Sequence, residues 1–190
     1  MWQPLRDIAP LAEAWRTAEP FPHVVVDDYT PAGDLMTALD DFGVNRYESD
    51  LFAFEATAPD ALDPLAAGFA ATLGPQLAQI TGKRIRSADM RAYAYRPGHY
   101  LLPHTDHQDG LERVLAYAYY LPTPEPPRGG ELELYRCTVT GGTLATIEPA
   151  HVIEPAPWRL AVFDVSAVSL HQVREVLAGL RLSLAGWFYP

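Results

Sequence analysis

The segment "RVLAYAYYLPTPEPPRGGELELYRC", residues 113–137, contains two short apolar runs separated by a loop rich in proline and glycine. Short apolar runs with aromatic and β-branched residues, bounded by such loops, are typical of β-strands. The loop itself, residues 122–130, is short and stiffened by proline, which predicts a hairpin connection between the two strands. The segment therefore predicts a protein built mainly from β-strands.

The same alternation of short apolar runs and turn residues continues from about residue 86 to residue 190. Further strands are predicted at "SADMRAYAY", "HVIEP", "RLAVFDVS" and "LRLSLAGWFY". Many short strands at regular spacing favour a sandwich or a small barrel over a parallel sheet with crossover helices. We therefore expect a β core in this half of the chain.

The N-terminal half is predicted to begin with a strand and a helix. Residues 21–30, "FPHVVVDDYT", contain a β-branched run that predicts a strand. Thr30 as N-cap and Pro31 at the first helical position predict a helix that continues through residues 32–42.

A second helix is predicted over residues 60–81, which are rich in Ala and Leu at helical spacing. The pair Gly74 and Pro75 predicts a break within it. We expect one domain over residues 1–190, mainly β with N-terminal helices (α+β). In this division, residues 1–85 supply a strand and supporting helices, which pack outside the β core of residues 86–190.

The composition is that of a globular protein, with 48% hydrophobic and 20% charged residues. Its formal net charge is -10, so its summed field repels phosphate backbones and anionic lipid, and we expect neither nucleic acid nor a membrane as a partner. Its start, "MWQPLRDIAPLAEAW", does not have the pattern of a signal peptide, which favours the cytoplasm. Cys137 is the single cysteine, so a bound metal must be held by His and carboxylate side chains.

The stretch "LLPHTDHQDG", residues 101–110, contains a possible pair of metal ligands. In an extended segment His104 and Asp106 point to the same side, whereas the directly following His107 points away. His171 stands out as a third ligand because it follows an apolar strand and a short turn. Two imidazoles and one carboxylate form the facial triad of non-haem Fe(II) oxygenases, which leaves positions open for reactants. Taken alone, an H-x-D tripeptide often arises by chance.

Arg181 follows His171 by ten residues and lies within the otherwise apolar "GLRLSLAGWFY". A buried guanidinium without an anionic partner costs several kcal/mol, so an arginine that points into a barrel requires a bound carboxylate. The alternative is an outward side chain paired with a surface acid. Strand parity alone leaves both arrangements open.

Several ordered blocks between residues 88 and 190 resemble one family. They are "YRPGHYLLPHTD", "YYLPTPEPPRGGELELY" and "HQVREVLAGLRLSLAGWFY". Together with the order of His104, Asp106, His171 and a basic residue ten positions later, they resemble the 2-oxoglutarate- and Fe(II)-dependent dioxygenases of the prolyl-hydroxylase type. The opening "PFPHVVVDDYTP" is more loosely similar to the first strand of that group.

The resemblance implies a double-stranded β-helix, which is a cupin-like jelly roll. It implies that His104, Asp106 and His171 hold Fe(II), and that Arg181 binds the distal carboxylate of 2-oxoglutarate. O2 would be the second cosubstrate, with ascorbate as a possible supporting reductant. The reaction would yield succinate and carbon dioxide and hydroxylate an unactivated C–H bond of the substrate.

Strand parity in "RVLAYAYYLP" adds residues to the expected cosubstrate site. If Tyr120 points inward, so do Ala118 and Ala116, which leaves room for a five-carbon diacid. By the resemblance, the Tyr120 hydroxyl shares the distal carboxylate with Arg181, and Tyr95 lines the same pocket. The other side chains expected in its wall are Leu132, Val173 and Trp187. The alternative for each of these tyrosine and wall residues is an ordinary place in the core.

We expect an Fe(II)- and 2-oxoglutarate-dependent hydroxylase, most simply of a prolyl residue in a peptide or protein. Free amino acids and small natural-product intermediates are alternative substrates. A halogenase is disfavoured because Asp106 is present, and Arg181 disfavours a metal-binding cupin-like protein without oxygenase activity. A catalytically inactive scaffold is disfavoured by the intact ligands. Residues 43–60 are expected to form a substrate lid, and the protein to be a monomer or homodimer.

Overall fold

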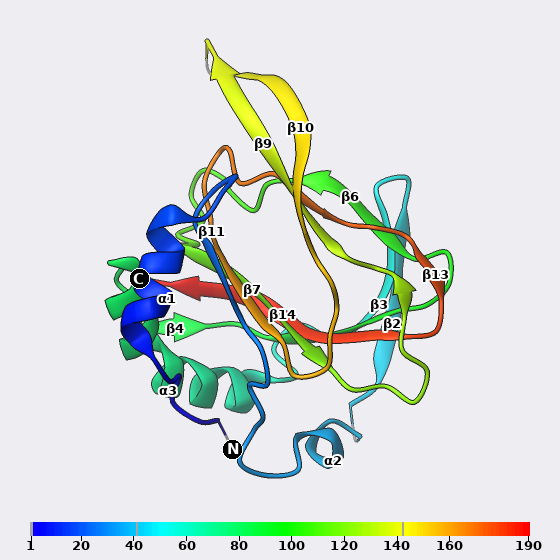
Figure 1. Ribbon diagram of the computed structural model, residues 1–190. Helices are drawn as coiled ribbons and strands as arrows, with labels where there is room; N and C mark the ends of the chain where they lie inside the picture. The colour runs from blue at the N-terminus through cyan, green and yellow to red at the C-terminus, as the bar shows by residue number, and fades with distance from the viewer. Residues whose placement is uncertain (1, 41, 142) are drawn as a thin grey trace.

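The computed structural model describes residues 2–40, 42–141 and 143–190 (Figure 1). The helices are α1 (Ile8–Thr17), α2 (Leu35–Leu39) and α3 (Asp63–Thr81). The strands of the first half are β1 (His23–Val26), β2 (Val44–Ser49), β3 (Phe52–Thr57), β4 (Ser87–Ala88) and β5 (Arg91–Tyr95). The later strands are β6 (Tyr100–His104), β7 (Leu115–Leu121), β8 (Arg128–Gly129), β9 (Leu132–Thr140), β10 (Thr143–Ile153), β11 (Leu160–Asp164), β12 (His171–Val173), β13 (Val176–Ala178) and β14 (Arg181–Tyr189).

Most strands belong to one antiparallel sheet, in the order β1-β11-β7-β14-β5-β3-β6-β12-β9-β10. The sheet curls until its two halves face each other, as Figure 1 shows. Side chains from strands far apart in this order share one core, for example Ala118 of β7 and Leu134 of β9. The curled sheet is the jelly roll that the sequence predicts, and the expected fold class is confirmed.

The proline-rich loop of residues 122–130 is not a hairpin connection, and that prediction is wrong. β7 pairs with β11 and β14, whereas β9 pairs with β12 and β10. Because both edges of β7 are already occupied, the loop has to cross to the opposite half of the sheet. It is held there by the backbone of Leu180, whose N–H donates to the carbonyl of Glu125 at 3.0 Å.

A glycine allows this crossing to pack closely against the turn before β14. Gly179 has a φ of 71°, and a Cβ at this position would lie 2.3 Å from the carbonyl oxygen of Pro126. Any other residue would clash with the loop backbone, which has no flexible side chain to move aside.

The two predicted helices differ from the structure in their limits. α2 begins at Leu35, and Asp34, not Thr30, caps it: the Asp34 carboxylate accepts from the Thr37 backbone N–H at 3.0 Å. α3 continues through Pro75 without a break. Its interior residues Leu73 and Leu77 are fully buried on either side of the proline. Burial of this face outweighs the loss of one helical hydrogen bond.

Two segments form regular structure that the sequence analysis did not predict. Residues 8–17 form α1, which packs on α3. The expected lid, residues 43–60, contains the hairpin β2–β3, and β3 extends the main sheet by pairing with β5 and β6. Residues 1–85 therefore contribute strands to the sheet as well as the helices that cover it.

The helices cover the outer face of the sheet, as expected (Figure 1). Phe69 of α3 is fully buried there. Its ring lies 4.9 Å from that of Tyr117, 5.6 Å from that of Phe188 and 4.6 Å from that of Trp2, measured between centroids. In the described segments no helix is long and apolar enough to cross a lipid bilayer.

Replacing Phe69 with Ala should lower the free energy of unfolding by about 3–5 kcal/mol, because it removes an aromatic ring from a closely packed site and leaves a cavity. Leu177→Ala is the control, since Leu177 is 55% exposed and its loss should change stability by less than about 0.5 kcal/mol. Urea denaturation followed by circular dichroism measures both. Equal stability of the two variants would contradict the packing described here.

Candidate metal centre and cosubstrate cavity

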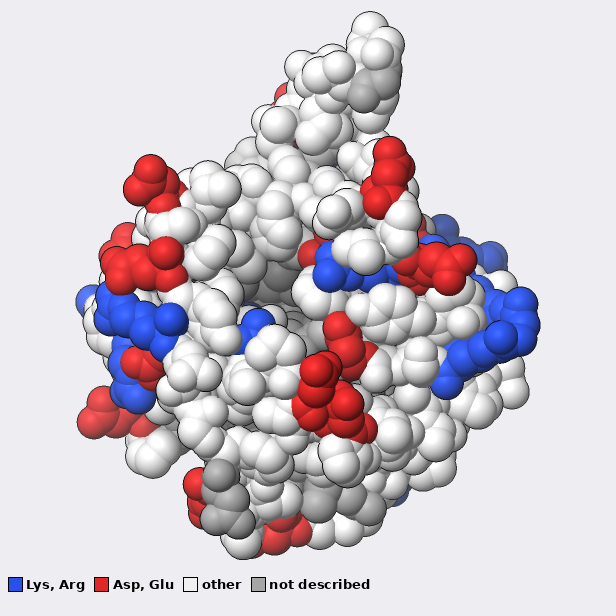
Figure 2. Space-filling model, turned by 180° about the vertical axis from the view of Figure 1, so that it is seen from behind, with Lys and Arg blue, Asp and Glu red and all other residues white. Residues whose placement is uncertain are grey.

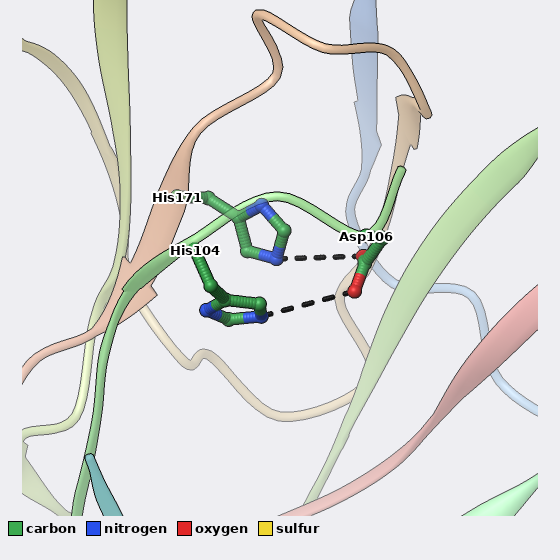
Figure 3. Close-up of side chains that lie close together, drawn as sticks. All are labelled: His104, Asp106 and His171. Atoms are coloured by element: carbon green, nitrogen blue, oxygen red, sulfur yellow. Dashed lines mark ion pairs between the residues drawn. The ribbon is translucent and has the colours of Figure 1, made fainter. Parts of the chain in front are cut away.

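His104, Asp106 and His171 come together in the structure (Figure 3). Their ligand atoms all lie within 4.8 Å of one another. The Asp106 carboxylate is 3.8 Å from Nε2 of His104 and 3.5 Å from Nε2 of His171. Within the described residues, this is the single group of His, Cys, Asp and Glu side chains with the geometry of a metal site.

The register between two strands brings the histidines together. His104 is the last residue of β6 and His171 the first of β12, and they are direct partners in the antiparallel pairing of these strands. Side chains of directly opposite residues lie on the same face of a sheet, about 5 Å apart at Cβ. Asp106, two residues beyond His104, completes the group from the turn that follows β6.

Both imidazoles are oriented by their own backbone. Nδ1 of His104 lies 2.9 Å from the carbonyl oxygen of Leu102, and Nδ1 of His171 lies 3.0 Å from that of Ser169. A carbonyl can only accept, so each Nδ1 carries the hydrogen and each Nε2 presents a lone pair toward Asp106. This is the tautomer that a metal-binding histidine requires.

Burial keeps His171 neutral. The side chain is only 4% exposed, and this desolvation lowers its pKa to about 4, with the negative charge of Asp106 acting in the opposite direction. Neutral imidazole is the form that binds a cation. The neighbouring His107 points elsewhere: its side chain is 48% exposed and its Nε2 is 3.9 Å from Asp109.

A cavity of about 310 Å³ opens beside the three ligands. Figure 2 shows the face of the molecule that is hollowed near its centre. All the residues expected in the pocket wall line this cavity, together with Tyr95 and Arg181: Ala116, Ala118, Leu132, Val173 and Trp187. Ala116 and Ala118 of β7 line it and share a core cluster with Tyr120, whereas Tyr117 and Tyr119 belong to the core cluster under the helices, although Tyr117 also contacts the cavity.

Arg181 points inward and is only 3% exposed. Its Cζ lies 4.7 Å from the ring centroid of Tyr95 and 5.0 Å from that of Tyr120, and its Nη1 donates to the Ser183 hydroxyl at 3.2 Å. Among the residues that the structure describes, no carboxylate lies within 4 Å of it, and its Nε has no hydrogen-bond partner. The outward alternative is therefore wrong, and this guanidinium lacks the anion that its burial demands.

Tyr95 lines the cavity, but Tyr120 does not. It lies against Arg181 but is fully buried and is absent from the described lining of the cavity. Its hydroxyl has no hydrogen-bond partner in the described part of the chain. A small movement of Arg181 or a bound carboxylate would be needed to bring the Tyr120 hydroxyl into a hydrogen bond.

Several residues of this site were not predicted from the sequence. Ser183 could have been found, because it is two positions beyond Arg181 on the same strand and so must face the same side. The aromatic residues of the wall that were not predicted are Phe52, Phe54, Tyr93, Tyr117 and Phe163. Phe52 and Phe54 come from the expected lid segment, and no local pattern shows that β3 would reach the cavity.

Arg113 supports the metal-binding turn from outside. Its guanidinium lies over the ring of Trp187 at 3.5 Å, and its Nη1 donates to the backbone carbonyl of Asp106 at 3.4 Å. Trp187 is fixed in turn by Asp89, whose carboxylate accepts from the Trp187 backbone N–H at 2.6 Å. These contacts limit the movement of the turn that carries Asp106.

Comparison with known proteins agrees with this geometry. A family model described as the 2OG-Fe(II) oxygenase superfamily matches residues 90–189. Prolyl 3-hydroxylase OGFOD1 of Mus musculus is 34% identical over 119 residues, which cover 60% of this chain and 21% of the mouse protein. The Xenopus laevis protein of the same name is 27% identical over 186 residues, which cover 90% of this chain and 35% of that protein.

The chain thus spans about a fifth to a third of the length of these curated relatives. Among solved structures, a prolyl-4-hydroxylase of Pseudomonas putida has the same fold, with a TM-score of 0.69, 22% identity, and coverage of 96% of this chain and 98% of the other. The family model spans more than half of the chain and includes His104, Asp106, His171 and Arg181. The protein belongs to the 2OG-Fe(II) oxygenase superfamily.

Proposed function

We propose that the protein is an Fe(II)- and 2-oxoglutarate-dependent dioxygenase that hydroxylates a prolyl residue in a peptide or protein. One observation carries the proposal: a single cavity contains the His-Asp-His group and, in its wall, a buried guanidinium without an acidic partner among the described residues. The first requires a cation and the second an anion. Fe(II) and 2-oxoglutarate supply both.

His104, Asp106 and His171 would hold the metal. The set of two neutral imidazoles and one carboxylate matches the ligand preference of non-haem Fe(II), and the ligands approach from one side, which leaves room for cosubstrates. Bound Fe(II), with 2-oxoglutarate and O2, supplies the oxidising power for attack on an unactivated C–H bond. The protein itself contributes position, charge and a largely apolar cavity.

Arg181 would bind the distal carboxylate of 2-oxoglutarate, with the Ser183 hydroxyl beside it and Tyr95 beneath it. Charge-assisted hydrogen bonds to a planar guanidinium are strong, and the apolar surroundings strengthen them further. The Tyr120 hydroxyl, an unpartnered donor whose ring lies against Arg181, would share the same carboxylate. Ala116 and Ala118 would leave space for the five-carbon chain.

The prolyl residue as target is supported by the relatives from mouse and frog, which are prolyl 3-hydroxylases. A cavity that opens to the surface beside several aromatic side chains suits a proline ring presented by a chain. Hydroxylation of a free amino acid or of a small natural-product intermediate is the alternative. The cytoplasm, a single domain over residues 1–190 and a monomeric or homodimeric state remain predictions.

Removal of one metal ligand should abolish metal binding. In His104→Ala or Asp106→Ala the dissociation constant for Fe(II), measured anaerobically by calorimetry, should rise more than about 100-fold, because even outer contacts of such sites contribute 10- to 100-fold. His107→Ala is the matched control and should bind Fe(II) like the parent protein. Unchanged affinity in the first two variants would exclude this metal site.

Arg181→Lys should weaken 2-oxoglutarate binding by about 10- to 100-fold, since a flexible ammonium replaces two directed charge-assisted hydrogen bonds. The affinity for Fe(II) should not change. Arg96→Lys alters an exposed arginine that pairs with Glu55 and serves as control. Calorimetric titration of the Fe(II)-loaded proteins with 2-oxoglutarate separates the two effects, and equal affinity of both variants would contradict the role of Arg181.

The protein with Fe(II), 2-oxoglutarate, O2 and ascorbate should add one oxygen atom to a proline-containing peptide and produce succinate in equal amount. Mass spectrometry of a panel of peptides and free amino acids measures both products. Oxygen gained by free proline alone would favour the small-molecule alternative. If 2-oxoglutarate is not consumed with any member of the panel, the proposed activity is wrong for these substrates.

A further inference from the structure

Three arginines lie against aromatic rings in and around the cavity. Besides Arg181, Arg113 lies over Trp187, and Arg91 lies 4.8 Å from the ring centroid of Tyr47 and 5.6 Å from that of Tyr93. Over the described ranges, none of the three has an acidic side chain within 4 Å, although the chain has a net charge of -10. Of the three, Arg181 lines the cavity, which also contains the carboxylate of Asp106, while Arg91 and Arg113 lie against the lining residues Tyr93 and Trp187.

The strand register places Arg91 and Arg181 at opposite ends of one face. In the pairing of β5 with β14, Tyr95 is opposite Arg181, Tyr93 is opposite Ser183, and Arg91 is opposite Ala185. All of these residues have the same parity and project to the cavity side. From Arg181 to Ala185 is four residues, which is about 13 Å along a strand. Arg91 itself is not among the residues that line the cavity, but this register places it on the same face beyond Tyr93, at the edge that we call the rim, and well away from Arg181.

Hydrogen bonds along one edge of the guanidinium and aromatic rings against its plane hold the Arg91 side chain in place. Its Nε and Nη2 both donate to the backbone carbonyl of Thr57, at 2.8 and 2.5 Å. The rings of Tyr47 and Tyr93 restrict its plane. Its Nη1 amino group has no acidic partner in the described part of the chain. A half-buried guanidinium fixed in this way loses little entropy when it binds an anion.

We propose that Arg91 binds a carboxylate of the substrate that is hydroxylated, and so selects substrates with a negative charge next to the target carbon. The inference rests on the proposed function, in which Arg181 is occupied by 2-oxoglutarate. Arg91 then remains for a second anion at the rim. A planar guanidinium matches a carboxylate better than any neutral amide, because its hydrogen bonds are charge-assisted.

Two sources of this carboxylate are chemically equivalent at Arg91. One is the side chain of an Asp or Glu that follows or precedes the target proline in a peptide. The other is the α-carboxylate of a free amino acid. Each has a neutral counterpart of the same shape, so charge can be tested with little change in size.

The test measures binding to the parent protein loaded with Fe(II) and 2-oxoglutarate without O2. The probes are N-acetyl-Pro-Glu-amide with its Gln counterpart, N-acetyl-Glu-Pro-amide with its Gln counterpart, and free proline with prolinamide. Calorimetry should give at least tenfold tighter binding of the carboxylate in at least one pair. The pair that shows the preference identifies the source of the carboxylate.

Arg91→Gln should remove this preference while leaving the affinities for Fe(II) and 2-oxoglutarate unchanged. Arg96→Gln, the matched control on an exposed arginine, should retain the preference. The inference is overturned if every carboxylate probe binds no tighter than its amide, if nothing binds, or if Arg91→Gln keeps the preference. A separate aerobic assay for added oxygen tests the proposed function, so a binding preference without product would contradict that function alone.

Discussion

The antiparallel pairing of β6 with β12 is the contact on which the rest of the site depends. It makes His104 and His171 direct neighbours on one face, although most of the jelly roll lies between them in the sequence. The hydrogen bonds from each Nδ1 to a nearby carbonyl then fix both rings with Nε2 toward Asp106. Local backbone contacts thus set the tautomer of the two histidines, while the long-range register of β6 and β12 sets the distance between them.

In the opposite wall of the cavity, alternate residues of one strand face the same side. Along β14, every second residue from Arg181 to Trp187 lines the cavity, and β5 adds Tyr93 and Tyr95 beside them. The intervening side chains Leu182, Leu184 and Phe188 pack with the helices. One face of β14 therefore packs in the hydrophobic core, and its other face forms part of the cavity wall. A substitution that disturbs the core side of this strand is expected to displace the cavity side as well.

Charge is distributed unevenly in this protein. The chain as a whole is acidic, yet the guanidinium of Arg181 lines the cavity, and those of Arg91 and Arg113 lie on the rings of Tyr93 and Trp187 in its wall. Aromatic faces attract cations while providing no counter-charge, so they keep arginine in place without neutralising it. Such an arrangement leaves the positive charge of Arg181 available to an anionic ligand inside the cavity.

Local signals in the sequence predict the strand periodicity, the parity that groups His104 with Asp106, and the common face of Ala116, Ala118 and Tyr120, but not whether that face points inward. The positions of His171 after an apolar strand and of Arg181 within one made them candidates, and the family resemblance implied their roles. Four features follow from the three-dimensional packing instead: Arg181 points inward, residues 122–130 cross between the halves of the sheet, α3 passes through Pro75, and β3 brings Phe52 and Phe54 to the cavity. These outcomes depend on which strand edges are already paired and on which faces are buried, and neither is fixed by neighbouring residues.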